Sequence, residues 1–152
     1  MIATPLTAPL LRGIADLEET SRGVRPHRLP GWVRSRFPDP QLLSMEAQPA
    51  GVRLSFTTLA ETIELVSHPT RLAYRGIARP RGAIDLVIDD RPAGSDLLDG
   101  GDIVEVDLAT GASERLRGPS HVSRFTGLPA GDKLVELWLP HNEALELVAL
   151  RT

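Results

Sequence analysis

The stretch Gly51-Val52-Arg53-Leu54-Ser55-Phe56-Thr57-Thr58 decides the fold class, because apolar and polar side chains alternate along it. This period of two places one side of the chain in a core and the other in solvent, as in a half-buried β-strand. Runs of similar length recur at residues 62–67, 83–90, 104–108, 113–117, 133–139 and 144–151. Turn residues separate these runs, and residues 109–112 read as a hairpin turn. The sequence therefore predicts an all-β protein, an antiparallel β-sandwich of jelly-roll type.

Residues 1–50 differ in character and are expected to form an irregular N-terminal arm that packs on a sandwich of residues 51–152. Thr7, Pro9 and the apolar residues that follow have the capping and spacing of one short helix. Prolines between residues 21 and 49 exclude long regular elements there. Trp32 and Phe37 lie in this stretch and are expected to anchor the arm against the core. Both parts together form a single structural domain.

The composition is that of one globular domain, with 152 residues, 41% of them apolar and 24% charged. The net charge of −3 argues against a nucleic-acid partner. No run approaches the ~18 apolar residues of a membrane span, and the N-terminus lacks the basic region of a signal peptide. We therefore expect a cytoplasmic protein without membrane contact, with secretion as the alternative. The absence of cysteine excludes disulfides, thiolate zinc sites and cysteine nucleophiles.

The last two predicted strands are apolar on both faces. In residues 133–139, one face carries Val135, Leu137 and Leu139. The other face carries Leu134 and Trp138. In residues 144–150, Leu145 and Leu147 share a face, and Val148 and Leu150 are expected opposite. Such strands are either central in a sheet or covered by something outside the sandwich. The N-terminal arm or a partner domain could supply that cover.

The connection between these strands holds the candidate site residues Trp138, His141, Asn142 and Glu143. No Gly-x-Ser-x-Gly or Gly-Asp-Ser block accompanies them, so self-contained hydrolysis is not expected. His141 and Glu143 are two metal-ligand types, but no third ligand stands at a recognisable spacing. We favour a structural role in which both bond the backbone of a tight turn, and we expect no metal and no cofactor.

Three further features are weaker candidates. Trp138 shares its face with Glu136 and could stack on a sugar ring, although ordinary packing under the arm or a partner is favoured. The Gly-rich loop of residues 94–102 carries three aspartates like a calcium loop, but its spacing does not fit an EF-hand, which favours a solvated loop. Arg75 follows Tyr74 in a predicted turn and is a candidate ligand contact.

Four strings of the chain carry a resemblance: GVRLSFTT at 51–58, YRG at 74–76, IDLVID at 84–89 and VELWLPHNE at 135–143. In this order they resemble the N-terminal β-sandwich domain of bacterial SGNH/GDSL-type esterases, lipases and acyltransferases. In that family a jelly-roll module, somewhat like a carbohydrate-binding module, precedes an α/β catalytic domain. The resemblance covers nearly the whole chain, most strongly residues 51–150. The ELWLPHNE string is its most specific part.

The family's catalytic half, with its Gly-Asp-Ser nucleophile block and later Asp-x-x-His pair, has no counterpart here, so no catalytic residue is carried over. The resemblance implies a domain taken from a longer enzyme, not catalytic on its own. Its expected partner is the SGNH catalytic domain of the same polypeptide, with a glycan or small acyl acceptor as a further candidate. Docking is expected around Trp138 and the loop 140–143. An independent carbohydrate-binding module is the alternative function.

Overall fold

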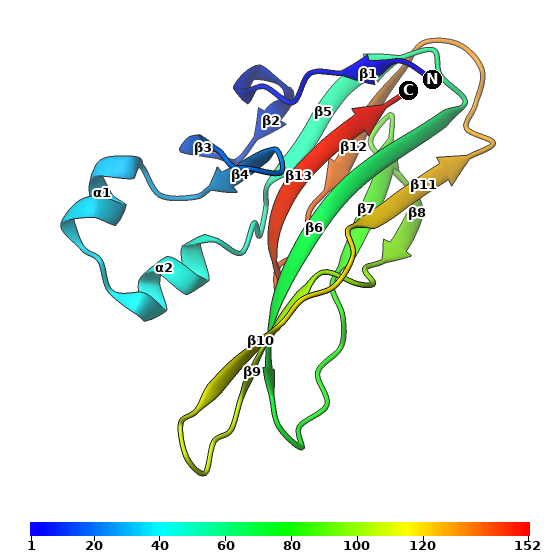
Figure 1. The fold of residues 1–152 in the computed structure, drawn as a ribbon. Coiled ribbons are helices and arrows are strands. Elements are labelled where there is room, and N and C mark those ends of the chain that lie inside the picture. The colour runs from blue at the N-terminus through cyan, green and yellow to red at the C-terminus, as the bar shows by residue number, and fades with distance from the viewer.

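The computed structural model describes all of residues 1–152 and shows two β-sheets packed face to face (Figure 1). The all-β sandwich that the alternating sequence predicts is therefore confirmed. The eight-stranded sheet consists of β1 (Ala3–Thr4), β3 (Asp16–Glu19), β4 (Val24–His27), β6 (Thr62–Tyr74), β9 (Asp102–Val106), β10 (Ser113–Leu116), β11 (His121–Thr126) and β13 (Ala144–Arg151). The five-stranded sheet consists of β2 (Leu11–Arg12), β5 (Arg53–Thr58), β7 (Ala83–Ile88), β8 (Arg91–Leu97) and β12 (Lys133–Trp138).

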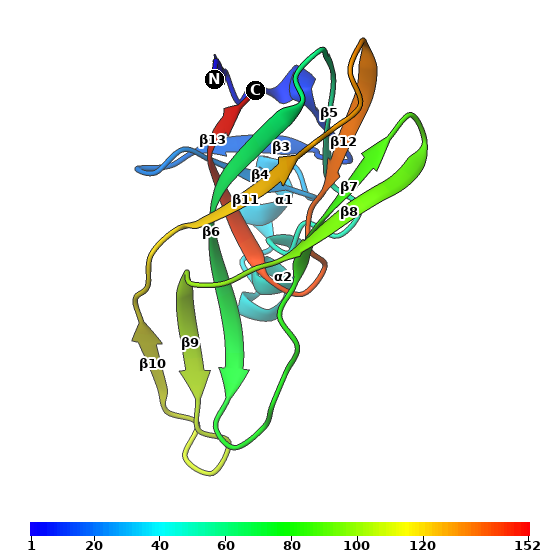
Figure 2. The ribbon, with the colours of Figure 1, turned by 90° about the vertical axis from the view of Figure 1, so that its right-hand side faces the viewer.

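The strand order places the last two strands of the chain inside their sheets. The larger sheet runs β10-β9-β6-β13-β4-β3, with β1 also paired to β13 and β11 to β6, and the smaller runs β2-β5-β12-β7-β8. Pairing is antiparallel throughout except between β6 and β9, where Thr70 lies beside Asp102. Figure 2 shows that the β9–β10 hairpin and the end of β6 extend together beyond the rest of the sandwich.

The core forms where the inward faces of the two sheets meet. Leu137 of β12 lies between Leu54 of β5 and Leu86 of β7, and all three are fully or almost fully buried. Ile63 and Leu65 of β6 belong to the same cluster from the opposite sheet. Burying a side chain of this size contributes about 1.5–3 kcal/mol. The alternation of the sequence therefore becomes one continuous apolar layer.

A β-bulge corrects the predicted faces of β13. The register to β6 shifts between Leu147 and Ala149, so Val148 is an extra residue on the β13 side. An extra residue reverses the direction of every side chain after it. Leu150 consequently points into the core with Leu145 and is fully buried, whereas Val148 is half-buried. The prediction that Leu150 lies opposite Leu145 is therefore wrong.

Residues 1–50 form more regular structure than an irregular arm. They supply four strands, and the backbone of Ile2 exchanges hydrogen bonds with Thr152, which brings the two termini together (Figure 1). The helix predicted from Thr7 is only a 3₁₀ turn, η1 (Ala8–Leu10), because Leu11 already pairs with β5 as part of β2. Two α-helices that the sequence did not predict follow, α1 (Gly31–Arg36) and α2 (Pro40–Glu46).

The two α-helices attach to the sandwich through polar groups. Trp32 and Phe37 are 65% and 54% exposed, so the prediction that they anchor the arm is wrong. The Asp39 carboxylate caps α2 by accepting from the backbone N–H of Leu42, at 2.9 Å. Within α2 only Glu46 is buried. None of the helices has the length and apolar character that a membrane-spanning segment requires.

Candidate functional site

The β12–β13 loop is fastened by a buried ion pair. Glu143 is 2% exposed, and its Oε1 accepts a hydrogen bond of 2.6 Å from Nε of Arg81, which precedes β7. The same guanidinium donates to the backbone carbonyl of Gly100, at 3.1 Å. A buried carboxylate is tolerated only when it is paired in this way. Glu143 thus ties together three loops at one end of the sandwich.

The two residues that precede Glu143 in the loop have different roles. Asn142 donates to the carbonyl of Pro80 at 3.1 Å, whereas the exposed His141 makes no hydrogen bond. The expected bonding of a turn backbone therefore comes from Asn142, and not from His141 or Glu143. Gly82 packs so closely against this loop that an added Cβ would lie 2.6 Å from the Cβ of Pro140. The loop is held rigidly, with the His141 ring left free.

Trp138 lies on the outer face of the five-stranded sheet in a fixed orientation. The guanidinium carbon of Arg53 stands 4.6 Å from the centroid of its ring, a cation–π geometry. Nε of Arg53 also donates to Glu136 at 2.7 Å, so Glu136 holds the cation above the indole. The predicted shared face of Trp138 and Glu136 is thus confirmed.

A groove of about 670 Å³ opens beside the indole of Trp138. Its walls are largely apolar and include Val87, Pro92 and Leu139. The carboxylate of Asp85 also lines it and is fixed by a 2.6 Å hydrogen bond from the Ser95 hydroxyl. Concave, mostly apolar surfaces with few polar groups are typical of binding sites.

Arg75 does not belong to this group. Its exposed side chain pairs with Glu105 at 3.2 Å and with Asp107 at 3.4 Å, both at the far end of β9. Exposed pairs of this kind stabilise a protein little. The structure therefore places Trp138 at the groove, with Glu136 on the same face of β12. Arg75 lies just after β6, against the β9–β10 hairpin.

The three aspartates of the Gly-rich loop have separate partners. Asp96 pairs with His121 at 2.7 Å, and Asp102 pairs with the buried His68 at 3.0 Å. Asp99 accepts from the backbone N–H of Gly100. No group of three or more His, Cys, Asp or Glu side chains is arranged to hold a metal ion.

His68 also contacts a serine, which produces an Asp–His–Ser chain that the sequence did not reveal. Ser120 Oγ lies 3.1 Å from Nδ1 of His68, and Asp102 faces Nε2. Burial alone would raise the pKa of Asp102, but hydrogen bonds from His68 and the Gly118 backbone outweigh it and leave the pKa below its ordinary 3.8. His68 and Asp102 are both 3% exposed, and neither lines a pocket of the protein. We interpret the chain as a structural link at the start of the β6–β9 pairing.

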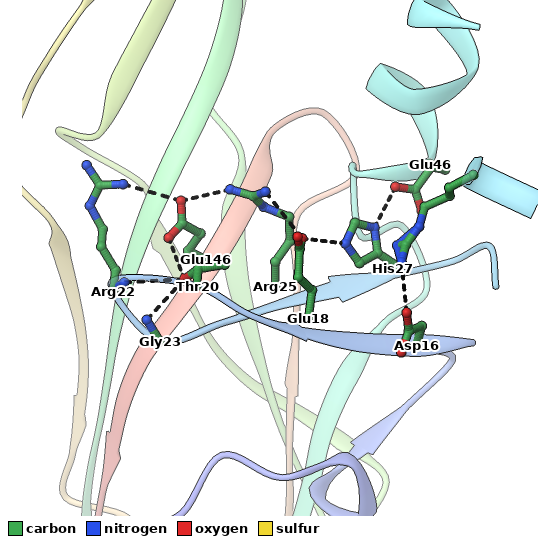
Figure 3. Close-up of polar contacts among 10 residues, drawn as sticks. Asp16, Glu18, Thr20, Arg22, Gly23, Arg25, His27, Glu46 and Glu146 are labelled. Atoms are coloured by element: carbon green, nitrogen blue, oxygen red, sulfur yellow. Dashed lines mark hydrogen bonds and ion pairs between the residues drawn. The ribbon is translucent and has the colours of Figure 1, made fainter. Parts of the chain in front are cut away.

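A second polar cluster lies on the same eight-stranded sheet, along the β3–β4 hairpin (Figure 3). His27 of β4 contacts two carboxylates, Glu46 of α2 at 2.6 Å and Glu18 of β3 at 2.9 Å. The hydrogen bond from His27 lowers the pKa of Glu18 from its ordinary 4.5, against the burial that would raise it. This cluster joins α2 to the hairpin.

Glu146 of β13 extends the same row of charges (Figure 3). Its Oε1 accepts from Arg25 at 2.9 Å and from Arg22 at 3.3 Å, and its Oε2 accepts from Thr20 at 2.9 Å. Glu146 lies more than 120 residues from each of these partners in sequence, so no local motif could predict the contacts. The only sequence signal is cross-strand charge pairing in the hairpin, where Glu18 stands opposite Arg25.

Comparison with known proteins places this β-sandwich domain in a family. Residues 10–148 match the family model described as SsfX3, N-terminal domain, and the chain belongs to that family. This agrees with the resemblance to the N-terminal domains of SGNH-type enzymes. A search of curated proteins finds no match.

Two solved structures share the fold. One is described as the salicylyl-acyltransferase SsfX3 from a tetracycline biosynthetic pathway, with a TM-score of 0.79 and 24% identity over 99% of this chain. The other is described as a GDSL-like lipase from Bacteroides ovatus, with a TM-score of 0.60 and 20% identity over 93% of this chain. The match spans only 38% and 37% of those chains. In both relatives the matching domain is therefore part of a longer polypeptide.

Proposed function

We propose that this chain is a non-catalytic accessory domain that docks on the catalytic domain of an SGNH/GDSL-type acyltransferase or hydrolase. Family membership supports the accessory role, since the matching family model is an N-terminal domain. The names of the two solved relatives support the reaction class, and each is a chain of which this domain matches little more than a third.

The observation that carries the docking proposal is the groove beside Trp138. Val87 and Pro92 give this groove apolar walls on the outer face of the five-stranded sheet, and the buried Leu139 forms part of its lining. A concave surface that is mostly apolar and carries a few fixed polar groups is typical of a binding site. Arg53 and Glu136 fix the indole in one orientation, so little conformational entropy is lost when a partner covers it.

The adjoining β12–β13 loop supports a role in shaping the substrate or acyl-acceptor site. The Glu143–Arg81 pair anchors the loop, and His141 is the exposed side chain at its tip. A rigid loop that follows directly on the docking strand can present one polar ring to a neighbouring active-site mouth. In this proposal His141 contacts the substrate or the catalytic domain. It is not the general base that activates the nucleophile.

The docking surface is tested by adding this domain to a separately produced catalytic domain of its own enzyme and measuring complex formation by calorimetry. Val87→Glu places a charge in the groove and is expected to abolish the complex. Val122→Glu is the matched control, because Val122 is an exposed apolar residue on β11 of the opposite sheet. If Val87→Glu binds the catalytic domain as tightly as Val122→Glu does, and melting temperatures show that both variants are folded, the groove is not the docking surface.

The contribution to the reaction is tested in the intact enzyme by following ester turnover. Trp138→Ala and His141→Ala are each expected to lower it, through lost docking in the first case and a lost contact in the second. Wild-type turnover and stability in both variants would contradict the proposal. Retention of the isolated domain on a glycan would instead favour the carbohydrate-binding alternative.

A further inference from the structure

A pocket of about 340 Å³ lies between the two α-helices and the outer face of the eight-stranded sheet. Six charged or ionisable side chains line it: Arg25, His27, Arg34, Glu46, Arg115 and Glu146. Leu43, Ala47 and Ala144 provide apolar wall between them. The pocket combines three guanidinium groups with a short apolar surface in a protein whose net charge is −3.

The acceptors of this pocket are already occupied. Both oxygens of Glu146 accept hydrogen bonds, Oε1 from two arginines and Oε2 from Thr20. Both oxygens of Glu46 are engaged as well, Oε1 by His27 and Oε2 by the backbone N–H of Leu29. A ligand that needed carboxylate acceptors would have to break these contacts. The two carboxylates therefore act as scaffolding for the arginines and the histidine.

The donors, in contrast, are not exhausted. Arg34 uses only Nη2, which donates to Asp16 at 2.8 Å, while its Nη1 is buried without a partner. Arg115 is half exposed, and its single ionic contact is 3.6 Å to Asp102. A guanidinium carries five N–H donors in a planar fork that matches carboxylate and phosphate oxygens. The hydrogen-bond donors of this pocket that lack a partner can therefore bind an anion.

An adjoining hollow repeats the pattern. A pocket of about 200 Å³ shares Ala47, Thr70 and Ala144 with the first and lies along the same side of α2. Arg71 lines it, and its Nε is also buried without a partner. Unpaired buried donors are rare in folded proteins and each calls for an explanation. Two of them, on guanidiniums that line adjoining pockets, point to the same ligand chemistry.

We propose that the pocket between α2 and the eight-stranded sheet is a binding site for a small oxyanion, a carboxylate or phosphate group carried on a short apolar body. Arg34 and Arg115 bind the oxygens from opposite sides, α1 and β10. Leu43 and Ala144 contact the apolar part. This site lies on the other sheet from the Trp138 groove and does not depend on the docking function.

The proposal is tested by titrating the 152-residue chain with sodium benzoate and, separately, with inorganic phosphate at constant ionic strength. Nuclear magnetic resonance follows the side-chain Nε–H signals of the arginines. Saturable shifts are expected at Arg34 and Arg115. Arg34→Gln and Arg115→Gln should each weaken binding about tenfold, which corresponds to about 1.4 kcal/mol.

Two matched controls lie two residues away in sequence, Arg36 on α1 with Arg34 and Arg117 just after β10, which carries Arg115. Arg36 and Arg117 are exposed, line no pocket and form no ion pair, so Arg36→Gln and Arg117→Gln should bind like the wild type. Arg115→Gln alters an exposed side chain and keeps the test valid even where Arg34→Gln unfolds the arm. Saturation by benzoate alone identifies an organic acid, and saturation by phosphate a phosphorylated ligand. No saturable shift with either, or equal affinity in Arg115→Gln, overturns the proposal.

Discussion

Nδ1 of His27 lies 2.6 Å from Oε1 of Glu46, and both side chains are buried. The other ring nitrogen, Nε2, lies 2.9 Å from Oε1 of Glu18, so the ring contacts two carboxyl groups. Since Glu46 is the only buried residue of α2, this contact fastens the helix to the β3–β4 hairpin (Figure 3). Polar side chains therefore hold α2 to the sandwich at this contact.

Glu46→Ala is expected to lower the free energy of unfolding by about 2 kcal/mol, because Nδ1 of the buried His27 and the backbone N–H of Leu29 lose their hydrogen-bond partner. Urea unfolding followed by circular dichroism measures the change. Glu19→Ala is the control, since Glu19 is exposed and forms no ion pair, and it should stay within about 0.5 kcal/mol of the wild type. An unchanged urea midpoint in Glu46→Ala would show that α2 is held by other contacts.

The protein is expected to lose stability in acid through Glu18 and Asp102. The pKa of each is lower in the folded protein than its ordinary value, 4.5 for Glu18 and 3.8 for Asp102. A depressed pKa stabilises the fold above the unfolded value, and this stabilisation is lost as the pH falls through the folded value. From these two groups, stability should be flat near neutral pH and decline below about pH 4.5.

Asp102→Asn separates the two contributions. The buried Asp102 should account for the steeper part of the decline, because Glu18 is 46% exposed and its interactions are screened by solvent. The variant should be less stable than the wild type at neutral pH and show a shallower loss in acid, measured by urea midpoints across the pH series. The same acid slope in both proteins would contradict the assignment to Asp102.

The fold was predictable where burial on one face imposed a period of two. Residues 53–58 of β5 and 133–138 of β12 show it, and both strands form as expected. Strand β8 was missed because its side chains are largely exposed and carry no alternation. The sequence predicts the wrong face for Leu150 for a different reason. The bulge at Val148 depends on the pairing of β13 with β6 and cannot be read from β13 alone.

The candidate site was predictable only in part. Trp138 and Glu136 are two residues apart on one strand, so their shared face follows from local geometry. The Glu143–Arg81 pair joins residues 62 apart, and the Arg25–Glu146 pair joins residues 121 apart. Contacts of that range depend on the strand order of the whole sandwich, which periodicity does not reveal.

Arg81→Leu is expected to lower the free energy of unfolding by about 3 kcal/mol, because it leaves the Glu143 carboxylate buried and unpaired. The double variant Arg81→Leu with Glu143→Leu should regain part of that loss, since no buried charge remains. A double-mutant cycle in urea, including Glu143→Leu alone, measures the coupling between the two positions. Additive effects of the two changes would show that the pair does not fasten the β12–β13 loop.

Gly23→Ala is expected to detach the β3–β4 hairpin from β13. An added Cβ at Gly23 would lie 2.1 Å from the carbonyl oxygen of Leu147, a backbone atom next to the bulge that cannot move aside without breaking the sheet. We expect a loss of about 2 kcal/mol, as for other overpacked sites, with faster amide hydrogen exchange in residues 16–27. Gly127→Ala is the control, because nothing lies within 4 Å of its added Cβ and only its positive φ of 69° costs energy, about 1 kcal/mol. If amide exchange in the hairpin is as slow in Gly23→Ala as in the wild type, the close approach to Leu147 is not needed to hold the β3–β4 hairpin on β13.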